Sequence, residues 1–400
     1  MRTPTNKNDV LIPEVSSDIG LSVAARGSAI STVATPKIFG ADELTVVPLS
    51  RNGSLNQGLD SEATRHGGGG GEERIAILYE NHQWLEGLFR ELDFRGLPYH
   101  AINLDDAALF LDAPDDYPLV INRVSPSSYL RGHGSAIRLA TGWLEMLERS
   151  GKRVINGAAS FKVETSKVAQ HLLIRSLGLS APKTAVFNNR EAIRPLLHRF
   201  PFPAILKPDT GGSGAYIRYV PSREYLEYLL KDEDKLFGPD HVLLLQEFIT
   251  PADGTIVRTE FVDGEFLFAL KVRPVNTFNL CPADGCERPP AAGQSEGDSE
   301  PTVDFEHYSD ISSDAVAEAR AIVQEAGLEV GGVEYIESSD GQRYFFDINA
   351  PSVYRPDIVE AAGVDAMTKF VDFIEREYRK ELRKRMESLE AIDCNLRLTG

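Results

Sequence analysis

Short apolar segments that alternate with helical patterns constrain this chain most. Arg74–Tyr79 is an apolar run that predicts a buried strand, and His82–Arg95 carries leucine and phenylalanine at helical spacing. Further strands are predicted at Pro98–Leu104, Tyr117–Asn122 and Arg153–Asn156. Strands that alternate with helices are typical of a parallel sheet, so we expect a small α/β domain over residues 73–157.

Residues 1–72 lack such a pattern. They mix Thr, Ser, Asn and Gly without a sustained period and end in the run Gly67–Gly71, a composition typical of flexible linkers. We therefore expect a disordered tail. A start codon assigned too far upstream would explain the same composition.

Deleting residues 1–72 should leave the Tm nearly unchanged, because a disordered tail adds no packed contacts to the folded state. Thermal unfolding of the full-length and truncated chains checks this. A large drop in Tm would show instead that the segment packs against the rest of the protein.

The remaining sequence falls into two blocks. In residues 158–249 we expect two helices, and three strands of which two are joined by a Gly-rich loop. Their ranges are Lys162–Leu177, Pro203–Pro208, Ala215–Val220, Arg223–Leu230 and His241–Ile249. In residues 250–390 we expect two hairpins and two helices. Their ranges are Ile256–Val262 with Glu265–Val272, then Asp314–Ala326, Gly332–Asn349 and a terminal helix from Asp365 to about Glu390. Between the first of these hairpins and the helix Asp314–Ala326, the segment Cys286–Asp304 is rich in Pro, Gly, Ser and acidic residues, which predicts a mobile surface loop.

The composition excludes several classes of function. A formal net charge of −18 argues against nucleic-acid binding, which needs an extended basic surface. No apolar run approaches the roughly 20 residues that cross a bilayer, and the N-terminus lacks the pattern of a secretory signal. Three cysteines (Cys281, Cys286 and Cys394) indicate a reducing compartment rather than a disulfide framework. We therefore expect a cytoplasmic protein with neither nucleic acid nor membrane as a partner.

The hairpin Gly332–Asn349 carries the clearest chemical pattern. A two-residue turn at Asp340-Gly341 would place Glu334 directly opposite Asp347, with Cβ atoms roughly 4.5–5.5 Å apart. Asn349 would share their face, because side chains alternate along a strand. The other face, with Tyr344, Phe346 and Ile348, is predicted to be core. Two facing carboxylates and an amide oxygen suit Mg²⁺, although a solvated polar face without metal fits the same residues.

A Gly-rich segment, Lys207–Gly214, lies between two predicted strands. Its glycines would let backbone N–H groups approach a phosphate closely, and Lys207 at the end of an apolar strand would attract an anion. The segment fits neither a Walker A loop nor a Rossmann turn. A Gly-rich hairpin without a ligand remains an alternative for this segment considered alone.

Two weaker features complete the pattern. Lys167 lies near the start of a predicted helix, where a solvent-facing lysine is the ordinary interpretation. The apolar strand Leu243–Ile249 contains Gln246-Glu247 and could present backbone groups to a purine edge, although an ordinary core strand has the same pattern.

The order of these four features along the chain resembles the ATP-grasp superfamily. Within it the sequence is most similar to RimK-type glutamate ligases and glutathione synthetase, over roughly Arg74 to Tyr378. The resemblance implies an ATP-grasp fold of the mixed α/β (α+β) class. Its N-terminal parallel pre-ATP-grasp domain would span 73–157, its central lid subdomain 158–249, and its C-terminal subdomain with the metal hairpin 250–390.

The resemblance also implies roles for single residues. Lys167 and Lys207 would contact the phosphates and adenine of ATP, and the segment Gly211, Gly212, Ser213 and Gly214 would be the lid over the phosphates. The backbone of Glu247, Phe248 and Ile249 would hold the adenine. The family's ribose-binding acid is replaced here by Ile256, and Asp253 is the nearest substitute.

The implied metal ligands are Glu334, Asp347 and Asn349, for Mg²⁺ with Mn²⁺ as a substitute. Arg258 and Arg273 match arginines that face the substrate and the transferred phosphate. Tyr354 and Arg355 match positions that shape the acceptor pocket. The family needs no covalent nucleophile, so Cys281 and Cys286 are interpreted as non-catalytic.

The implied activity is ATP-dependent ligation of a carboxylate to an amine through an acylphosphate, with ADP as product. The partners would be small carboxylate and amine substrates or a peptide tail, and relatives are commonly homo-oligomers. The loop Cys281–His307 would set acceptor specificity. A small-molecule ATP-grasp kinase is one alternative, although it would need more cations than this acidic chain offers. A non-catalytic ATP-binding protein is the other.

Overall fold

The first sheet is parallel, and both of its faces are covered. The structure is a computed structural model that describes residues 73–108, 116–212, 214–231, 237, 240–275 and 302–399, with side chains as far as residue 392. The strand order is β2-β1-β3-β4. The strands are β1 (Ile75–Tyr79), β2 (Tyr99–Asn103), β3 (Leu119–Asn122) and β4 (Arg153–Ile155). All four predicted strands are thereby confirmed, and burial on both faces explains the continuous apolar runs of β1 and β3.

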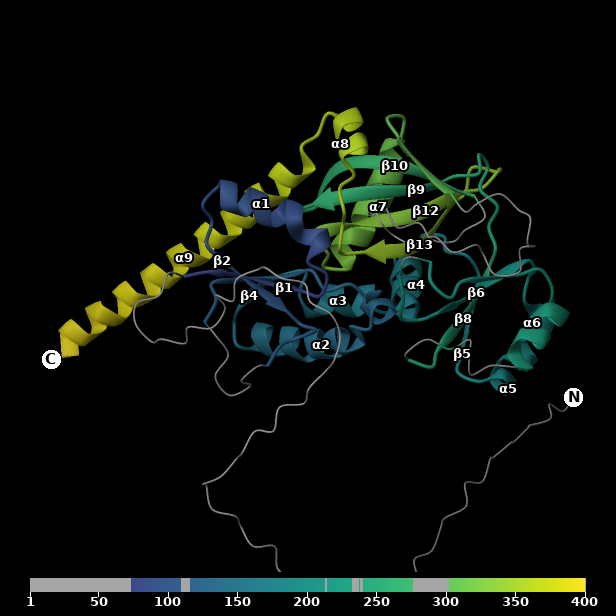
Figure 1. Ribbon diagram of the computed structural model, residues 1–400, viewed down its shortest axis with the longest axis horizontal. Helices are drawn as coiled ribbons and strands as arrows, with labels where there is room; N and C mark the ends of the chain where they lie inside the picture. The colour runs from purple at the N-terminus through teal and green to yellow at the C-terminus, as the bar shows by residue number, and fades with distance from the viewer. Residues whose placement is uncertain are drawn as a thin grey trace, which may run out of the picture. The chain divides into compact units, whose positions relative to one another are not determined.

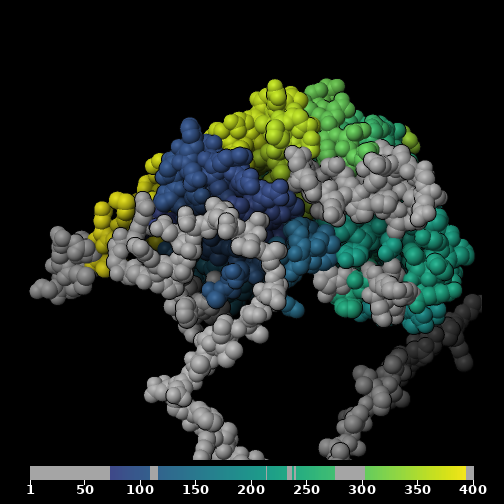
Figure 2. Space-filling model, in the orientation of Figure 1, coloured from purple at the N-terminus to yellow at the C-terminus, as the bar shows by residue number. Residues whose placement is uncertain are grey.

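Helices from distant parts of the chain cover this sheet. One face packs against α2 (Gly134–Arg149) and α3 (Ala158–Glu164), and the other against α1 (Glu86–Phe94) and α9 (Ala366–Thr399). Figure 1 shows α9 running beside α1, and in Figure 2 its yellow atoms lie against the blue residues of the N-terminal segment. The predicted terminal helix is therefore confirmed and is longer than expected. The sequence did not predict α2.

The second sheet is antiparallel, in the order β5-β8-β6-β7. Its strands are β5 (Thr184–Phe187), β6 (Ala204–Pro208), β7 (Arg218–Val220) and β8 (Leu243–Glu247), with α5 (Arg190–Ile193), the 3-10 helix η3 (Arg194–Arg199) and α6 (Arg223–Leu229) beside them. Together they enclose one hydrophobic cluster. The sequence did not predict β5, and the predicted strand Ala215–Val220 is shorter because residues 214–216 form a turn.

The third sheet has five antiparallel strands in the order β11-β10-β9-β12-β13. They are β9 (Ile256–Val262), β10 (Glu265–Val275), β11 (Thr302–His307), β12 (Val330–Glu337) and β13 (Arg343–Asn349). One face packs on α7 (Ser313–Glu325), and α8 (Pro356–Ala362) contacts β10 and β11. The end of the predicted loop Cys286–Asp304 belongs to β11, and its earlier part lies outside the described residues.

The predicted single helix Lys162–Leu177 is wrong. The chain forms α3, leaves the helix at Thr165, and begins again as α4 (Lys167–Ser176). Ser166 is extended (φ −135°), and its Oγ accepts the amide of Ala169 at 3.2 Å, which caps α4. Asp209 Oδ1 accepts the next free amide, that of Val168, at 2.8 Å. The break puts Lys167 at the first position of a helix that packs on β13.

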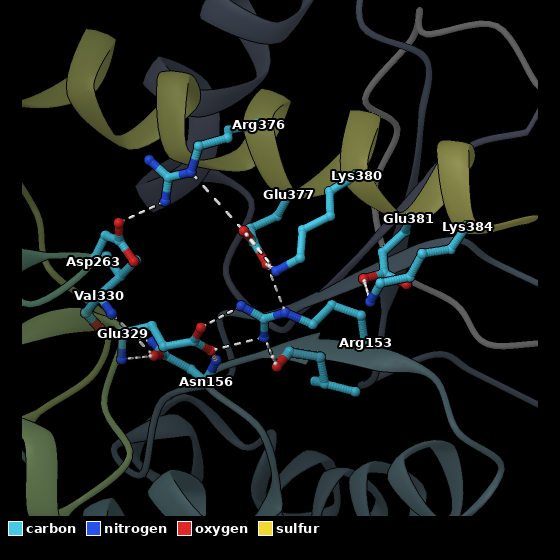
Figure 3. Close-up of polar contacts among 11 residues, drawn as sticks. Arg153, Asn156, Asp263, Glu329, Val330, Arg376, Glu377, Lys380, Glu381 and Lys384 are labelled. Carbon is cyan, nitrogen blue, oxygen red and sulfur yellow. Dashed lines mark hydrogen bonds and ion pairs between the residues drawn. The ribbon is translucent and has the colours of Figure 1, made fainter.

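A polar network joins the first and third sheets and α9 (Figure 3). Arg153 at the start of β4 pairs with Glu329 just before β12 and with Glu377 of α9. Buried Asn156 accepts the amides of Glu329 and Val330 at 2.9 and 3.1 Å and donates to Val330 O at 2.7 Å. This asparagine adopts φ +53°, a left-handed conformation that Asn tolerates better than most residues. The described helices include none that is long and apolar enough to cross a membrane.

Asn156→Ala should destabilise the protein by roughly 2–4 kcal/mol, because it leaves buried amides unsatisfied and places alanine at a positive φ. The midpoint of urea unfolding measures this. Asn156→Gly relieves the backbone conformation alone and should remain destabilised, whereas Lys384→Ala in an exposed ion pair should change little. Full stability of the glycine variant would show that the hydrogen bonds contribute little.

Candidate active site

A cavity of about 670 Å³ is lined by both antiparallel sheets and by the loop that follows β3. It contains most of the residues that the sequence singled out. Those on its lining are Lys167, Lys207, Gly211, Gly212, Gly214, Glu247, Phe248, Ile249, Arg258, Glu334, Asp347 and Asn349. Ser213 lies outside the described residues. The structure thus brings together residues that span more than 180 positions of sequence.

The hairpin of β12 and β13 pairs Glu334 with Asp347, as predicted, but by a different route. Ser338 and Gln342 close a three-residue loop through a 3.0 Å hydrogen bond, in place of the expected two-residue turn. A register shift after Glu334 then compensates for the extra residue. The bulge turns Phe346 toward the cavity and leaves Phe345 in the core, so the assignment of Phe346 to the core face was wrong. Ile348 is in the core, as predicted.

Each facing carboxylate has a cation from another element. Asp347 pairs with Lys167 of α4, and buried Glu334 pairs with Arg258 of β9 at 3.1 Å. Asn349 Nδ2 donates to Glu334 Oε1 at 3.3 Å. Burial and the neighbouring charge of Asp347 raise the pKa of Glu334 to about 7, against the opposing effect of Arg258.

These residues fit a hard divalent cation. Two carboxylates and an amide supply oxygen ligands, and a cation would relieve the repulsion from Asp347 that adds to burial in raising the pKa of Glu334. No group of three His, Cys, Asp or Glu side chains in the described part of the chain could form a separate metal site.

Gln170 holds Lys167 at this place. Its side-chain amide donates to Ile348 O at 3.0 Å and accepts from Ile348 N at 3.2 Å, which ties α4 to β13 beside Asp347. The sequence had not indicated a role for Gln170. One feature of the sequence could have indicated it: Gln170 is a polar residue on the apolar face of the helix, four positions before buried Ile174.

Lys207 is the last residue but one of β6 and is only 4 % exposed. Burial and, next, the charge of Lys167 lower its pKa to about 8. No hydrogen bond or ion pair joins its ammonium to another residue in the described ranges, and the Phe346 ring lies 5.9 Å away. A buried ammonium without a carboxylate partner provides a position for a bound anion.

The Gly-rich loop passes close to the segment that follows β3 in the first sheet. A Cβ at Gly211 would lie 3.2 Å from the hydroxyl of Tyr129, and one at Gly212 would lie 3.1 Å from Ser127 Cβ. Gly214 has φ +68°, which favours glycine. Larger residues would therefore displace the loop from this side of the cavity.

The segment Glu247–Ile249 lines the opposite part of the cavity. The amide of Glu247 donates to Lys183 O at 2.8 Å, and that of Phe248 to Pro203 O at 3.1 Å. The amide of Ile249 has no backbone acceptor among the residues described. It can therefore donate to a ligand, while the other two amides fix the backbone around it.

Arg273 and Asp253 are not brought into this group. Arg258 pairs with Leu270 across β9 and β10, so Arg273, three positions on, projects from the opposite face. It is exposed and donates to Asp253 O at 2.7 Å, and the Asp253 carboxylate pairs with Lys271 at 2.7 Å. Neither residue lines the cavity.

Two buried charged residues at the edge of the cavity, Glu164 and Arg123, were not predicted from the sequence. Glu164 lines the cavity and accepts the Ala350 amide at 3.2 Å with one oxygen, whereas its other oxygen has no partner within the described residues. Burial raises its pKa to about 8. Arg123 follows the carboxyl end of β3, the edge at which α/β sheets bind ligands, and that position was its signal in the sequence.

Lys207→Met should stabilise the metal-free protein at pH 7, on the order of 2 kcal/mol, because it removes a buried charge. The folded-state pKa of about 8 lies below the ordinary 10.5, so the unfolded chain binds more protons between these values. Wild-type stability should therefore rise with pH across this window, and the variant should lack the rise. Urea unfolding from pH 7 to 10 measures both, with Lys369→Met at an exposed position as control. A parallel rise in the variant would contradict the assignment.

No protein-family model matches the sequence. Known structures match most of it. A RimK domain ATP-grasp protein from Sphaerobacter thermophilus is 19% identical, covers 75% of this chain and 98% of its own, and has a TM-score of 0.56. The ATP-grasp ligase PsnB, solved with a minimal precursor, is 18% identical over 76% and 100%, with a TM-score of 0.55. The D-alanine–D-alanine ligase from Bacillus anthracis is 16% identical over 79% and 100%, with a TM-score of 0.57. Likeness at this identity concerns the fold alone, and the predicted fold is confirmed: this chain has the ATP-grasp fold.

Proposed function

We propose that this protein is an ATP- and Mg²⁺-dependent carboxylate–amine ligase that forms an amide bond and releases ADP and phosphate. The observation that carries the proposal is the pairing of Glu334 with Asp347 on a cavity face that also receives Lys167 and Lys207. Opposed carboxylates beside two lysines suit a metal-bound polyphosphate.

The nucleotide would lie between the two antiparallel sheets. The free amide of Ile249 would donate to the adenine edge, and the buried ammonium of Lys207 would pair with a phosphate. The backbone of Gly211–Gly214 would cover the phosphates. Glu334, Asp347 and Asn349 would hold Mg²⁺, or Mn²⁺ in its place, which neutralises charge on the transferred phosphoryl group.

The residues then have separate tasks in the reaction. A substrate carboxylate oxygen attacks the γ-phosphorus, ADP leaves, and an acylphosphate forms. An amine attacks the acyl carbon, loses a proton, and expels phosphate as the amide forms. Arg258, fixed by ion pairs to Glu260 at 2.6 Å and Glu334 at 3.1 Å, would stabilise negative charge that develops beside it. Arg273 and Asp253 would need to move to reach the cavity, so we assign them no step.

The ligands in the structures of one structural neighbour, PsnB, support this proposal. PsnB has been solved with Mg and ADP, and also with a precursor peptide and AMPPNP. Either a peptide or a small carboxylate and amine would be the partners here. We place the reaction in the cytoplasm, without nucleic acid or membrane.

The test is release of ADP and phosphate from ATP and Mg²⁺ with a pooled panel of amino acids and carboxylic acids. Phosphate release that requires both an acid and an amine supports the ligase. ADP without free phosphate would overturn it in favour of a kinase, and ATP binding without turnover on any pool would favour a non-catalytic binder.

Asp347→Asn should reduce Mg²⁺-dependent turnover by at least 100-fold while leaving the Tm close to that of the wild type, because it removes a metal-binding charge without changing shape. Steady-state phosphate release against Mg²⁺ concentration measures the effect. Glu337→Gln, at an exposed position of the same hairpin, is the matched control. Unchanged activity with the same magnesium requirement would refute the metal assignment.

A further inference from the structure

A second cavity, of about 290 Å³, adjoins the first. Trp84 and Val353 line both, and the second is otherwise formed by the start of α1, the segment after β13 and the first turns of α9. None of Glu334, Asp347 and Asn349 lines it. It is therefore a separate compartment beside the proposed reaction centre.

Arg123 is the most unusual residue of this compartment. It is 7 % exposed, and no carboxylate of the described residues lies within ion-pair distance of it, although Glu164 and Glu260 act on it electrostatically. Its terminal nitrogens donate to Ala350 O at 3.0 Å and Ser352 O at 2.8 Å, and the Phe370 ring lies 5.3 Å from the guanidinium. Its Nε–H is buried without a partner among the described residues. Burial lowers the pKa of Arg123, and the charges of Glu164 and Glu260 oppose this shift, but neither forms an ion pair with it, so a bound anion in direct contact would stabilise the buried guanidinium.

Tyr354 supplies a second unsatisfied donor. Its hydroxyl is buried, has no hydrogen-bond partner in the described part of the chain, and belongs to the lining of the same cavity. Two donors, one of them charged, match the two oxygens of one carboxylate. Arg90 lines the same cavity, and Arg355 on its lining pairs with Asp357 at 3.1 Å.

We propose that this compartment is a subsite for a substrate carboxylate that does not react, held by Arg123 Nε and the Tyr354 hydroxyl. The substrate with its free carboxylate there reaches past Trp84 and Val353 to the metal-binding face. That substrate is either a dicarboxylic acid or an amino acid that supplies the amine. The placement of the substrate's reacting group at the metal-binding face rests on the proposed function. Binding of the carboxylate in the second cavity can be tested without turnover.

Trp84 provides the readout. The chain has two tryptophans, and the other, Trp143, is buried in the core of the first sheet. We expect intrinsic fluorescence to change saturably with succinate or with L-alanine, and not with succinamide or L-alaninamide. A response to succinate alone identifies a dicarboxylic acid, and a response to L-alanine alone identifies an amino acid. The response should disappear in Trp84→Phe.

Tyr354→Phe is the decisive variant, because Arg123 also holds the backbone after Asn349 and its replacement could disturb the fold. Removing the hydroxyl should raise the Kd of the responding carboxylate about 10-fold, as expected for a lost hydrogen bond to a charged group. Arg123→Lys should weaken binding at least as much. Tyr228→Phe, at an exposed tyrosine of α6, should bind like the wild type.

Three results would overturn the subsite: no response to either acid, equal responses to acids and amides, or unchanged affinity in Tyr354→Phe. Phosphate release on the same samples separates the two proposals. Carboxylate binding without ligase turnover would refute the proposed function and leave the subsite standing. Turnover that is unaffected by Tyr354→Phe would refute the subsite alone.

Discussion

The opposition of Glu334 and Asp347 on adjacent strands is the constraint around which the rest of the site is arranged. Two carboxylates that face each other across a ladder destabilise a sheet unless cations compensate them. Here the compensation comes from elsewhere in the fold: Arg258 from the neighbouring strand and Lys167 from the start of α4. The hairpin therefore depends on contacts that it does not itself contain.

Those contacts account for the organisation of the surrounding elements. The break between α3 and α4 puts a lysine at a helix start, and Gln170 fixes that helix to the backbone of β13. Farther away, Asn156 and Arg153 tie the parallel sheet to the start of β12. The same strand thus carries a structural junction at one end and a proposed metal ligand near its middle.

Buried charged groups without an ion-pair partner distinguish sites for ligands from ordinary core. Lys207 and Arg123 are both nearly inaccessible and lack a carboxylate partner among the described residues. They lie in neighbouring cavities, which fits a nucleotide phosphate at Lys207 and the carboxylate of a second substrate at Arg123. Glu164, with one unpaired oxygen at the cavity edge, is the acidic counterpart.

The sequence by itself determined most of the strands, the pairing of Glu334 with Asp347 and the ATP-grasp resemblance, because apolar periodicity and strand pairing within a hairpin are local properties. Tertiary structure alone decided three other features. A bulge turned Phe346 into the cavity, since a one-residue change in loop length reverses the faces of a strand. Arg273 of β10 projects from the face of the sheet opposite to that of Arg258 on β9, so the two arginines do not meet. Long-range packing brought Gln170, Glu164 and Arg123 to the site, and no local pattern encodes which buried polar residues will meet there.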